Sequence, residues 1–270
     1  AGITAGKVVN FVAGNSLTNG GRITAKEDVS FKATTGKVAN SGAIEGASVE
    51  FIAGTDIVNE AEVSANKGVT FTAASNVTNS GKVNAAENVI FTAQDGYIIN
   101  KGEVRGEEVA FAAASNIVNE AGITAGKVVN FVAGNSLTNG GSITAKEDIS
   151  LKATTGKVAN SGAIEGASVE FMAGTDIVNE AGVAANKGVN FTATNHVTNS
   201  GKINAAENVS FAAQDGYIIN QGEVSGEEVA FNAETNIVNE AGITAGKVVN
   251  LVAGNSLTNG GVVTAKEGVT

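Results

Sequence analysis

The single histidine is the first candidate for a general acid or base. General acid–base catalysis usually needs a histidine or a carboxyl group with a shifted pKa, held in a cleft. His196 is the only histidine among the 270 residues, and the position 120 residues earlier holds Asn76. We therefore interpret His196 as a surface substitution within a repeat, and we predict that the chain has no catalytic residues and is not an enzyme.

Carboxylates and arginines are the other groups that could bind a ligand. Arg22 and Arg105 are the only arginines, and each is replaced by serine 120 residues later, so a role for either would belong to one copy alone. One segment carries three carboxylates that recur 120 residues later, and oxygen ligands of this kind suit a divalent cation. They are Glu50, Asp56 and Glu60, with Glu170, Asp176 and Glu180. We interpret them as a solvated acidic face, and we expect no metal, no cofactor and no cofactor-binding residue.

Three segments match the asparagine glycosylation sequon. They are Asn76-Val77-Thr78, Asn190-Phe191-Thr192 and Asn208-Val209-Ser210. A repeat rich in asparagine and threonine generates such matches by chance, so the sequence alone gives them no role.

Composition excludes several classes of partner and of membrane segment. The net charge is -10 with only two arginines, which argues against a surface for nucleic acid. There is no cysteine, hence no disulfide framework. The longest apolar run is the six residues from Val109 to Ala114, so we expect no transmembrane segment. The chain has no initiator methionine and reads as an excerpt of a longer protein.

A repeat of 20 residues orders the whole chain. All 11 phenylalanines fall on one lattice, from Phe11 to Phe231, with Leu151 and Leu251 at the two remaining positions. Valine or isoleucine lies two residues before each lattice position and alanine two residues after it, which is the alternation of a strand with one buried face. A second apolar column is followed two residues later by asparagine, from Asn19 to Asn259, and a third column starts near Ile3. The pattern predicts three short strands per coil.

The spacings between coils show a longer period. Successive coils run 20, 21 and 19 residues, and the extra residue falls in turns that end in Gly36 or Gly96, where we expect a positive φ. Three coils make a 60-residue unit, and residues 121–240 differ from residues 1–120 at only 18 positions. We therefore describe residues 1–270 as one continuous β-helix segment with copies at 1–120 and 121–240 and a partial copy at 241–270.

These patterns predict an all-β fold, a right-handed parallel β-helix of about 13 coils. Each column meets its own copy after one coil, so equivalent strands must pair in parallel, and such connections are right-handed in nearly all proteins. Stacking then places equivalent residues of adjacent coils about 4.8 Å apart, and the side-chain amides of the asparagines form a hydrogen-bonded ladder. Lys7 with Glu27 and Lys67 with Glu87 become neighbours on adjacent coils.

The unit at residues 1–21, AGITAGKVVNFVAGNSLTNGG, resembles the repeats of filamentous haemagglutinin-type exoproteins. That group includes two-partner-secreted adhesins and contact-dependent growth-inhibition toxins. The resemblance covers the whole chain and implies a long β-helical shaft. It also implies an outer-membrane secretion partner and a location outside the cell or on the bacterial cell surface.

We therefore expect a structural stalk of a surface adhesin or secreted exoprotein fibre. One alternative is the subunit of a self-polymerising extracellular filament. A second is a polysaccharide-binding or polysaccharide-cleaving β-helix, although such enzymes build their sites from long loops and every coil here is within one residue of 20. The expected partners are flanking coils of the same longer chain, or end-to-end copies of it.

Overall fold

The computed structural model describes residues 2–270, and these residues form β-strands and turns only. They divide into two compact units, residues 1–133 and 134–270. Each unit is a parallel β-solenoid with three strands per coil, and the two together comprise about 13 coils, which confirms the predicted fold class. No described residue lies in a helix long and apolar enough to cross a membrane.

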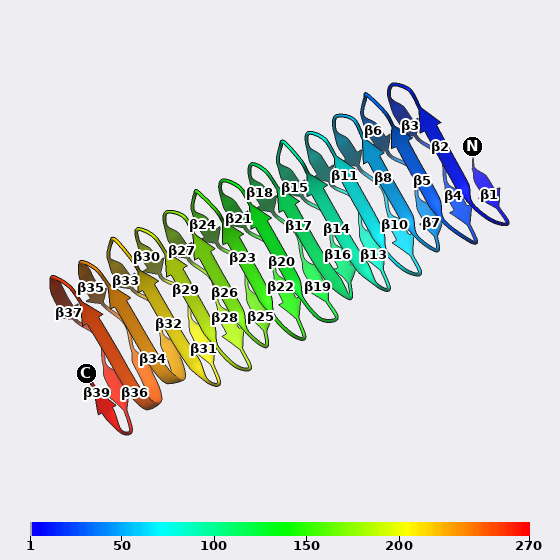
Figure 1. Cartoon of the computed structure of the whole chain (residues 1–270). Coiled ribbons are helices and arrows are strands. Elements are labelled where there is room, and N and C mark those ends of the chain that lie inside the picture. Colours follow the sequence, from blue (N-terminus) through cyan, green and yellow to red (C-terminus); the bar gives the residue numbers. More distant parts are fainter. Residues whose placement is uncertain (1) are drawn as a thin grey trace. The chain divides into compact units, whose positions relative to one another are not determined.

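Unit 1 contains three columns of strands (Figure 1). The first column holds β1 (Ile3–Ala5), β4 (Ile23–Ala25), β7 (Ile44–Gly46), β10 (Val63–Ala65), β13 (Val83–Ala85), β16 (Val104–Gly106) and β19 (Ile123–Ala125). The second holds β2 (Val9–Ala13), β5 (Val29–Ala33), β8 (Val49–Ala53), β11 (Val69–Ala73), β14 (Asn88–Ala93), β17 (Glu108–Ala113) and β20 (Val129–Ala133). The third holds β3 (Leu17–Asn19), β6 (Val38–Asn40), β9 (Ile57–Asn59), β12 (Val77–Asn79), β15 (Ile98–Asn100) and β18 (Ile117–Asn119).

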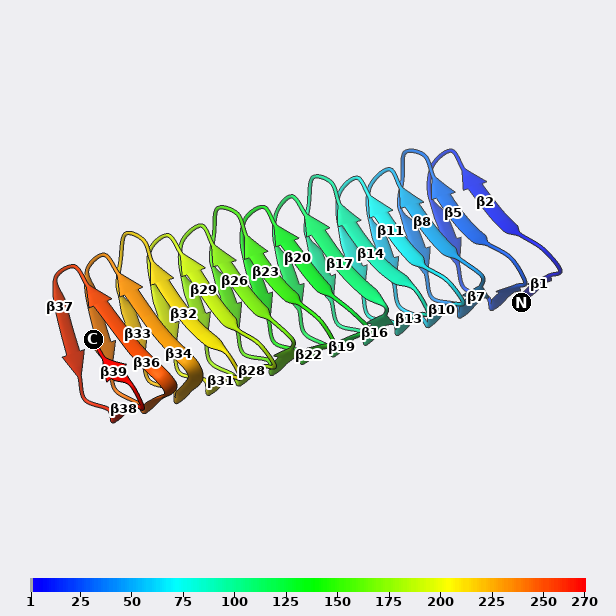
Figure 2. The same ribbon diagram turned by 60° about the horizontal axis from the view of Figure 1, so that its bottom comes forward.

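Unit 2 repeats the three columns, and Figure 2 shows its first-column strands along one edge of the ribbon. The first column holds β22 (Ile143–Ala145), β25 (Ile164–Gly166), β28 (Val183–Ala185), β31 (Ile203–Ala205) and β38 (Val263–Ala265). The second holds β23 (Ile149–Ala153), β26 (Val169–Ala173), β29 (Val189–Ala193), β32 (Asn208–Ala213) and β39 (Gly268–Val269). The third holds β21 (Leu137–Asn139), β24 (Val158–Asn160), β27 (Ile177–Asn179), β30 (Val197–Asn199), β33 (Ile218–Asn220), β35 (Asn236–Asn239) and β37 (Ser256–Asn259). Two long strands, β34 (Val224–Ala233) and β36 (Ile243–Ala253), run through the first and second columns without a break, so these two columns form one sheet there.

Parallel pairing puts each residue beside its own equivalent in the next coil. Phe71 of β11 pairs with Phe51 of β8 on one side and with Phe91 of β14 on the other. Alternation of side chains along each strand then sends valine, phenylalanine and alanine inward together. The register predicted from the 20-residue lattice is therefore confirmed.

The phenylalanine column is the centre of the core in both units. Phe51, Phe71 and Phe91 have no exposed surface, and neighbouring ring centroids in the column lie 4.4 to 5.3 Å apart. Most pairs stack face to face, but Phe71 meets Phe91 edge-on, at 76°. The equivalent pair in unit 2, Phe191 and Phe211, does the same at 81°. At this step the two sequence copies thus pack their aromatic rings alike, whereas Leu151 interrupts the ring column at the position of Phe31.

The asparagine column is the buried polar part of the core. Every buried polar side chain among the described residues is an asparagine of this column, and none of these residues leaves a buried side-chain nitrogen or oxygen without a partner. Asn59 Nδ2 donates to Asn79 Oδ1 at 2.7 Å and to the Ala61 carbonyl at 2.8 Å, and Asn40 Nδ2 donates to Asn59 Oδ1. Such bonds run from coil to coil within each unit and confirm the predicted ladder.

Glycine occurs in these turns for a different reason from the one expected. None of the described glycines has a positive φ, so Gly36 and Gly96 are not needed for backbone conformation. A Cβ on Gly36 would collide with the side chains of Asn15 and Ser16 in the coil below. A Cβ on Gly96 would likewise meet the side chain of Asn76. Close approach of the coils therefore selects glycine at these positions.

The predicted lysine–glutamate neighbours lie side by side, but the ion pairs form elsewhere. The Glu27 amide donates to the Lys7 carbonyl at 3.3 Å, as adjacent coils require, yet no ion pair joins their side chains among the described contacts. In the same column, Lys127 Nζ lies 3.3 Å from Glu107 Oε1. Both of these side chains are well exposed, so the pair adds about 0 to 1 kcal/mol.

We predict that Phe91→Ala destabilises unit 1 by about 3 to 5 kcal/mol, because a fully buried ring is replaced by a cavity. Repeat proteins add up local terms, so hydrogen exchange should speed up mainly in β11, β14 and β17. Thr92→Ala is the matched control, because the chain itself carries Ala212 at the equivalent position. Equal loss of protection in every coil of the unit would contradict the prediction.

A second prediction concerns the ladder in unit 2. Asn199 is fully buried; its Nδ2 donates to the Gly201 carbonyl and to Asn220 Oδ1, and its Oδ1 accepts from Asn179. Asn199→Ala should lower the free energy of unfolding by about 2 to 4 kcal/mol, since the neighbouring amides lose buried partners. Urea unfolding measures the effect, with the outward-facing Thr198→Ala as control. Asn199→Ala and Thr198→Ala proteins of equal stability would rule the ladder out as a stabilising element.

Candidate functional site

Shallow grooves over the strands are the places where each unit can hold a ligand. Unit 1 has a groove of about 260 Å³ over its first column, lined by Arg22, Ile23, Ala43, Ile44, Glu45, Glu62 and Ser64. Unit 2 has a groove of about 330 Å³ over its first column, lined by Ser142, Thr144, Ala163, Ile164, Glu165, Gly182, Val183, Ala184, Lys202 and Asn204. It also has one of about 480 Å³ over its second column, which we call the second-column groove.

An ion pair partly fills the groove of unit 1. Arg22 Nη2 lies 3.4 Å from Glu45 Oε2, and both side chains are more than half exposed. The other arginine, Arg105, is exposed in β16, where its backbone pairs with Asn84 and Thr124. The two arginines therefore do not gather into one basic site.

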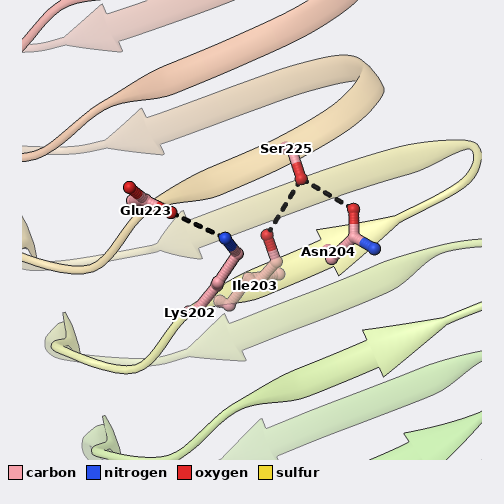
Figure 3. Close-up of polar contacts among 5 residues, drawn as sticks. All are labelled: Lys202, Ile203, Asn204, Glu223 and Ser225. Atoms are coloured by element: carbon pink, nitrogen blue, oxygen red, sulfur yellow. Dashed lines mark hydrogen bonds and ion pairs between the residues drawn. The ribbon is translucent and has the colours of Figure 1, made fainter.

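The first-column groove of unit 2 has lost this ion pair, because Ser142 stands at the position of Arg22. At its edge Lys202 Nζ donates to Glu223 Oε2 at 2.8 Å (Figure 3). This hydrogen bond, together with the charge of Lys202, lowers the pKa of the Glu223 carboxyl from its usual value. Ser225 Oγ donates to Asn204 Oδ1 at 2.7 Å beside the pair (Figure 3). The polar groups at this edge thus satisfy one another.

The second-column groove is lined by polar side chains that have no such partners. Its lining comprises Asp148, Ile149, Ser150, Ser168, Val169, Glu170, Gly188, Val189, Asn190, Asn208 and Ser210. Among the contacts described for the chain, none of these seven polar side chains makes a side-chain hydrogen bond. Three of the equivalent side chains in unit 1 do: Asp28 Oδ1 accepts the Ser48 amide at 3.1 Å, and Ser30 Oγ donates to Glu50 Oε2 at 3.5 Å. The groove of unit 2 therefore offers free hydrogen-bonding groups.

His196 lies in the turn before β30 and has a structural contact there. The His196 Nδ1 accepts a hydrogen bond from the backbone N–H of Tyr217 at 3.2 Å, and the backbone N–H of His196 donates to Asp176 Oδ1. The imidazole is half-buried and stacks on the Tyr217 ring with centroids 3.8 Å apart. Nδ1 accepts a hydrogen bond only when it carries no proton, so the bond fixes the ring's orientation and tautomer. His196 is thus more than the surface substitution that its repeat position predicted.

The same turn in unit 1 explains how asparagine and histidine exchange here. Asn76 Oδ1 accepts the Tyr97 amide at 3.1 Å, while Asn76 Nδ2 donates to Asp56 Oδ1 at 2.8 Å. Each residue at this position offers one acceptor to the backbone of the next coil. The turn therefore accepts either asparagine or histidine at this position.

The acidic residues of the predicted solvated face do not converge. Asp56 accepts bonds from Asn76, and Glu50 faces Ser30 in another column. No group of three or more histidine or acidic side chains that could hold a metal ion occurs among the described residues. The grooves could not be predicted from the 20-residue pattern, because each is lined by residues from several adjacent coils.

The grooves and the turn support hydrogen bonding as their chemistry. In the part of the chain that the structure describes, no serine or threonine hydroxyl is hydrogen-bonded to His196, whose Nδ1 faces a backbone amide instead. A nucleophile activated by a histidine would need that contact.

Comparisons with known proteins give no further identification. No protein-family model, no characterised protein and no solved structure matches the chain.

We predict that His196→Ala lowers the stability of unit 2 by about 1 kcal/mol, because the Tyr217 amide loses its acceptor. His196→Asn restores the residue found at position 76 and should stay within about 0.5 kcal/mol of the parent chain. Urea unfolding, with exchange of the Tyr217 amide as a local probe, measures both. If alanine and asparagine behaved alike, the Nδ1 bond would have no stabilising role.

Proposed function

We propose that the chain is a structural shaft: the stalk of a bacterial surface adhesin or of a secreted exoprotein fibre. The observation that carries the proposal is the regularity of each unit. Asparagine amides and phenylalanine rings stack from coil to coil, and the turns between the strands of residues 2–270 are of nearly constant length, without a long loop among them. The resemblance of the repeat to filamentous haemagglutinin-type exoproteins supports the same assignment.

Partners and location follow from this proposal. An outer-membrane secretion partner exports the chain, and the shaft stands outside the cell or on its surface. Flanking coils of a longer chain, or end-to-end copies, pack on the terminal coils.

The proposal is tested by changing the number of coils. Residues 241–250 repeat residues 121–130 without a difference, so deleting residues 121–240 joins residue 120 to its usual neighbour sequence. A shaft should shorten by about 29 Å, which is six coils at about 4.8 Å each, and deleting residues 61–120 should remove half as much. Small-angle scattering and electron microscopy measure the length.

Three outcomes would overturn this assignment. The first is a length that does not scale with the number of coils. The second is concentration-dependent growth of fibres from the purified chain, which would favour the self-polymerising filament. The third is cleavage of a polysaccharide by the intact chain, which would favour the enzyme alternative.

A further inference from the structure

Three of the 18 differences between the sequence copies line the second-column groove. One exchanges Val29 for Ile149, and each of the other two completes a sequon. Thr70 of the first copy is replaced by Asn190, which is followed by Phe191-Thr192. Ile90 is replaced by Ser210, which places a hydroxyl two residues after Asn208. The first copy lacks both sequons, because residue 70 is not asparagine and Asn88 is followed by Val89-Ile90.

The fold brings the two sequons together. Asn190 lies in β29 and pairs directly with Ser210 in β32, so the acceptor of one sequon sits beside the hydroxyl of the other. Residues two apart on a strand point to the same side, and here that side is the outer one. Asn208 is exposed, and Asn190, Thr192 and Ser210 are half-buried.

The side chains of both sequons are free to be modified. Within the described contacts, the side chains of Asn190, Thr192, Asn208 and Ser210 make no hydrogen bond to the protein. The groove that Asn190 and Asn208 line has a volume of about 480 Å³, within the range of sites that hold small molecules. Sugar hydroxyls would find acceptors nearby in Glu170 and Asp148.

The third sequon differs in its surroundings. Asn76 Nδ2 donates to Asp56 Oδ1 at 2.8 Å, and Asn76 Oδ1 accepts a hydrogen bond from the Tyr97 backbone N–H. A sugar on that nitrogen would replace one of its two hydrogens, while the other already donates to Asp56, so both amide atoms would stay tied to the half-buried turn. The sequon alone therefore does not distinguish the three sites, whereas their placement does.

We propose that Asn190 and Asn208 are asparagine-linked glycosylation sites and that the attached sugars lie along the second-column groove. In the reaction, the amide nitrogen Nδ2 attacks the anomeric carbon of a sugar activated as a phosphate ester. The new bond joins nitrogen to carbon, the bond from carbon to the phosphate oxygen breaks, and the phosphate leaves with the electron pair. The amide gives up one proton to a base of the transferase. The proposal goes beyond the shaft and does not depend on it.

The test expresses the full chain together with a soluble glycosyltransferase that recognises the sequon and uses a nucleotide-activated hexose. Peptide mass spectrometry of the folded, soluble fraction then gives the occupancy of each asparagine. We expect hexose on Asn190 and Asn208, at least ten-fold lower occupancy at Asn76, and none at Asn88, which occupies the equivalent strand position without the hydroxyl.

Two variants assign the sites, and both restore residues that the chain already carries at equivalent positions. Asn190→Thr should remove the first modification only. Ser210→Ile should remove the second while leaving Asn208 in place. The thermal midpoint of the modified chain should equal that of the unmodified one, because the sugars lie outside the core.

The proposal fails if the soluble chain carries no sugar at Asn190 and Asn208, or if Asn76 is occupied equally. It also fails if the modified chain is found only in the aggregated fraction. None of these results bears on the length of the shaft, so failure of the two proposals is distinguishable.

Discussion

Hydrogen bonding between coils at a fixed spacing is the constraint on which the rest of this structure depends. Parallel pairing sets every residue about 4.8 Å from its equivalent in the next coil, so each inward position must tolerate a copy of itself above and below. Asparagine meets this condition because one amide both donates and accepts: Asn179 Nδ2 donates to Asn199 Oδ1 while Asn179 Oδ1 accepts from Asn160. A buried ionised aspartate could only accept, so it would not satisfy its neighbours in both directions.

The same constraint explains where the two sequence copies have diverged. Three of the 18 differences are buried, and all three exchange one apolar residue for another: Val29 with Ile149, Phe31 with Leu151, and Val83 with Ile203. The remaining 15 lie in turns or on outward faces, and none of them is buried. Stacking therefore keeps the core alike while the surface is free to change.

Features that repeat at one position of every coil could be predicted from the sequence. Features that depend on contacts between different positions in adjacent coils could not. The strands, their register and the buried ladder could be predicted from the lattice of Phe11 to Phe231 and from the asparagine column. Each of these features arises because the same residue type recurs at the same position of successive coils. The reason for Gly36 was not accessible in this way, since it lies in the side chains of Asn15 and Ser16 one coil below. The contacts between His196 and Tyr217 join residues 21 apart in the sequence, so the pattern within one coil did not predict them. Lys127 pairs with Glu107, one of two glutamates that flank it in its column, and the column pattern alone did not predict which one.

Identical scaffolds with different surfaces also separate two kinds of role in one chain. The ladder and the ring stack need every coil to be equivalent, whereas a binding or modification site needs one coil to differ from the rest. In unit 1 the polar residues at the start of the second column bond to one another, as Ser30 does to Glu50. In unit 2 their counterparts Ser150 and Glu170 lack that bond, and Asn190 and Ser210 stand where threonine and isoleucine stood. Changes of this kind leave the core as it is, because the outward side chains lie outside the phenylalanine stack and the asparagine ladder that join the coils inside.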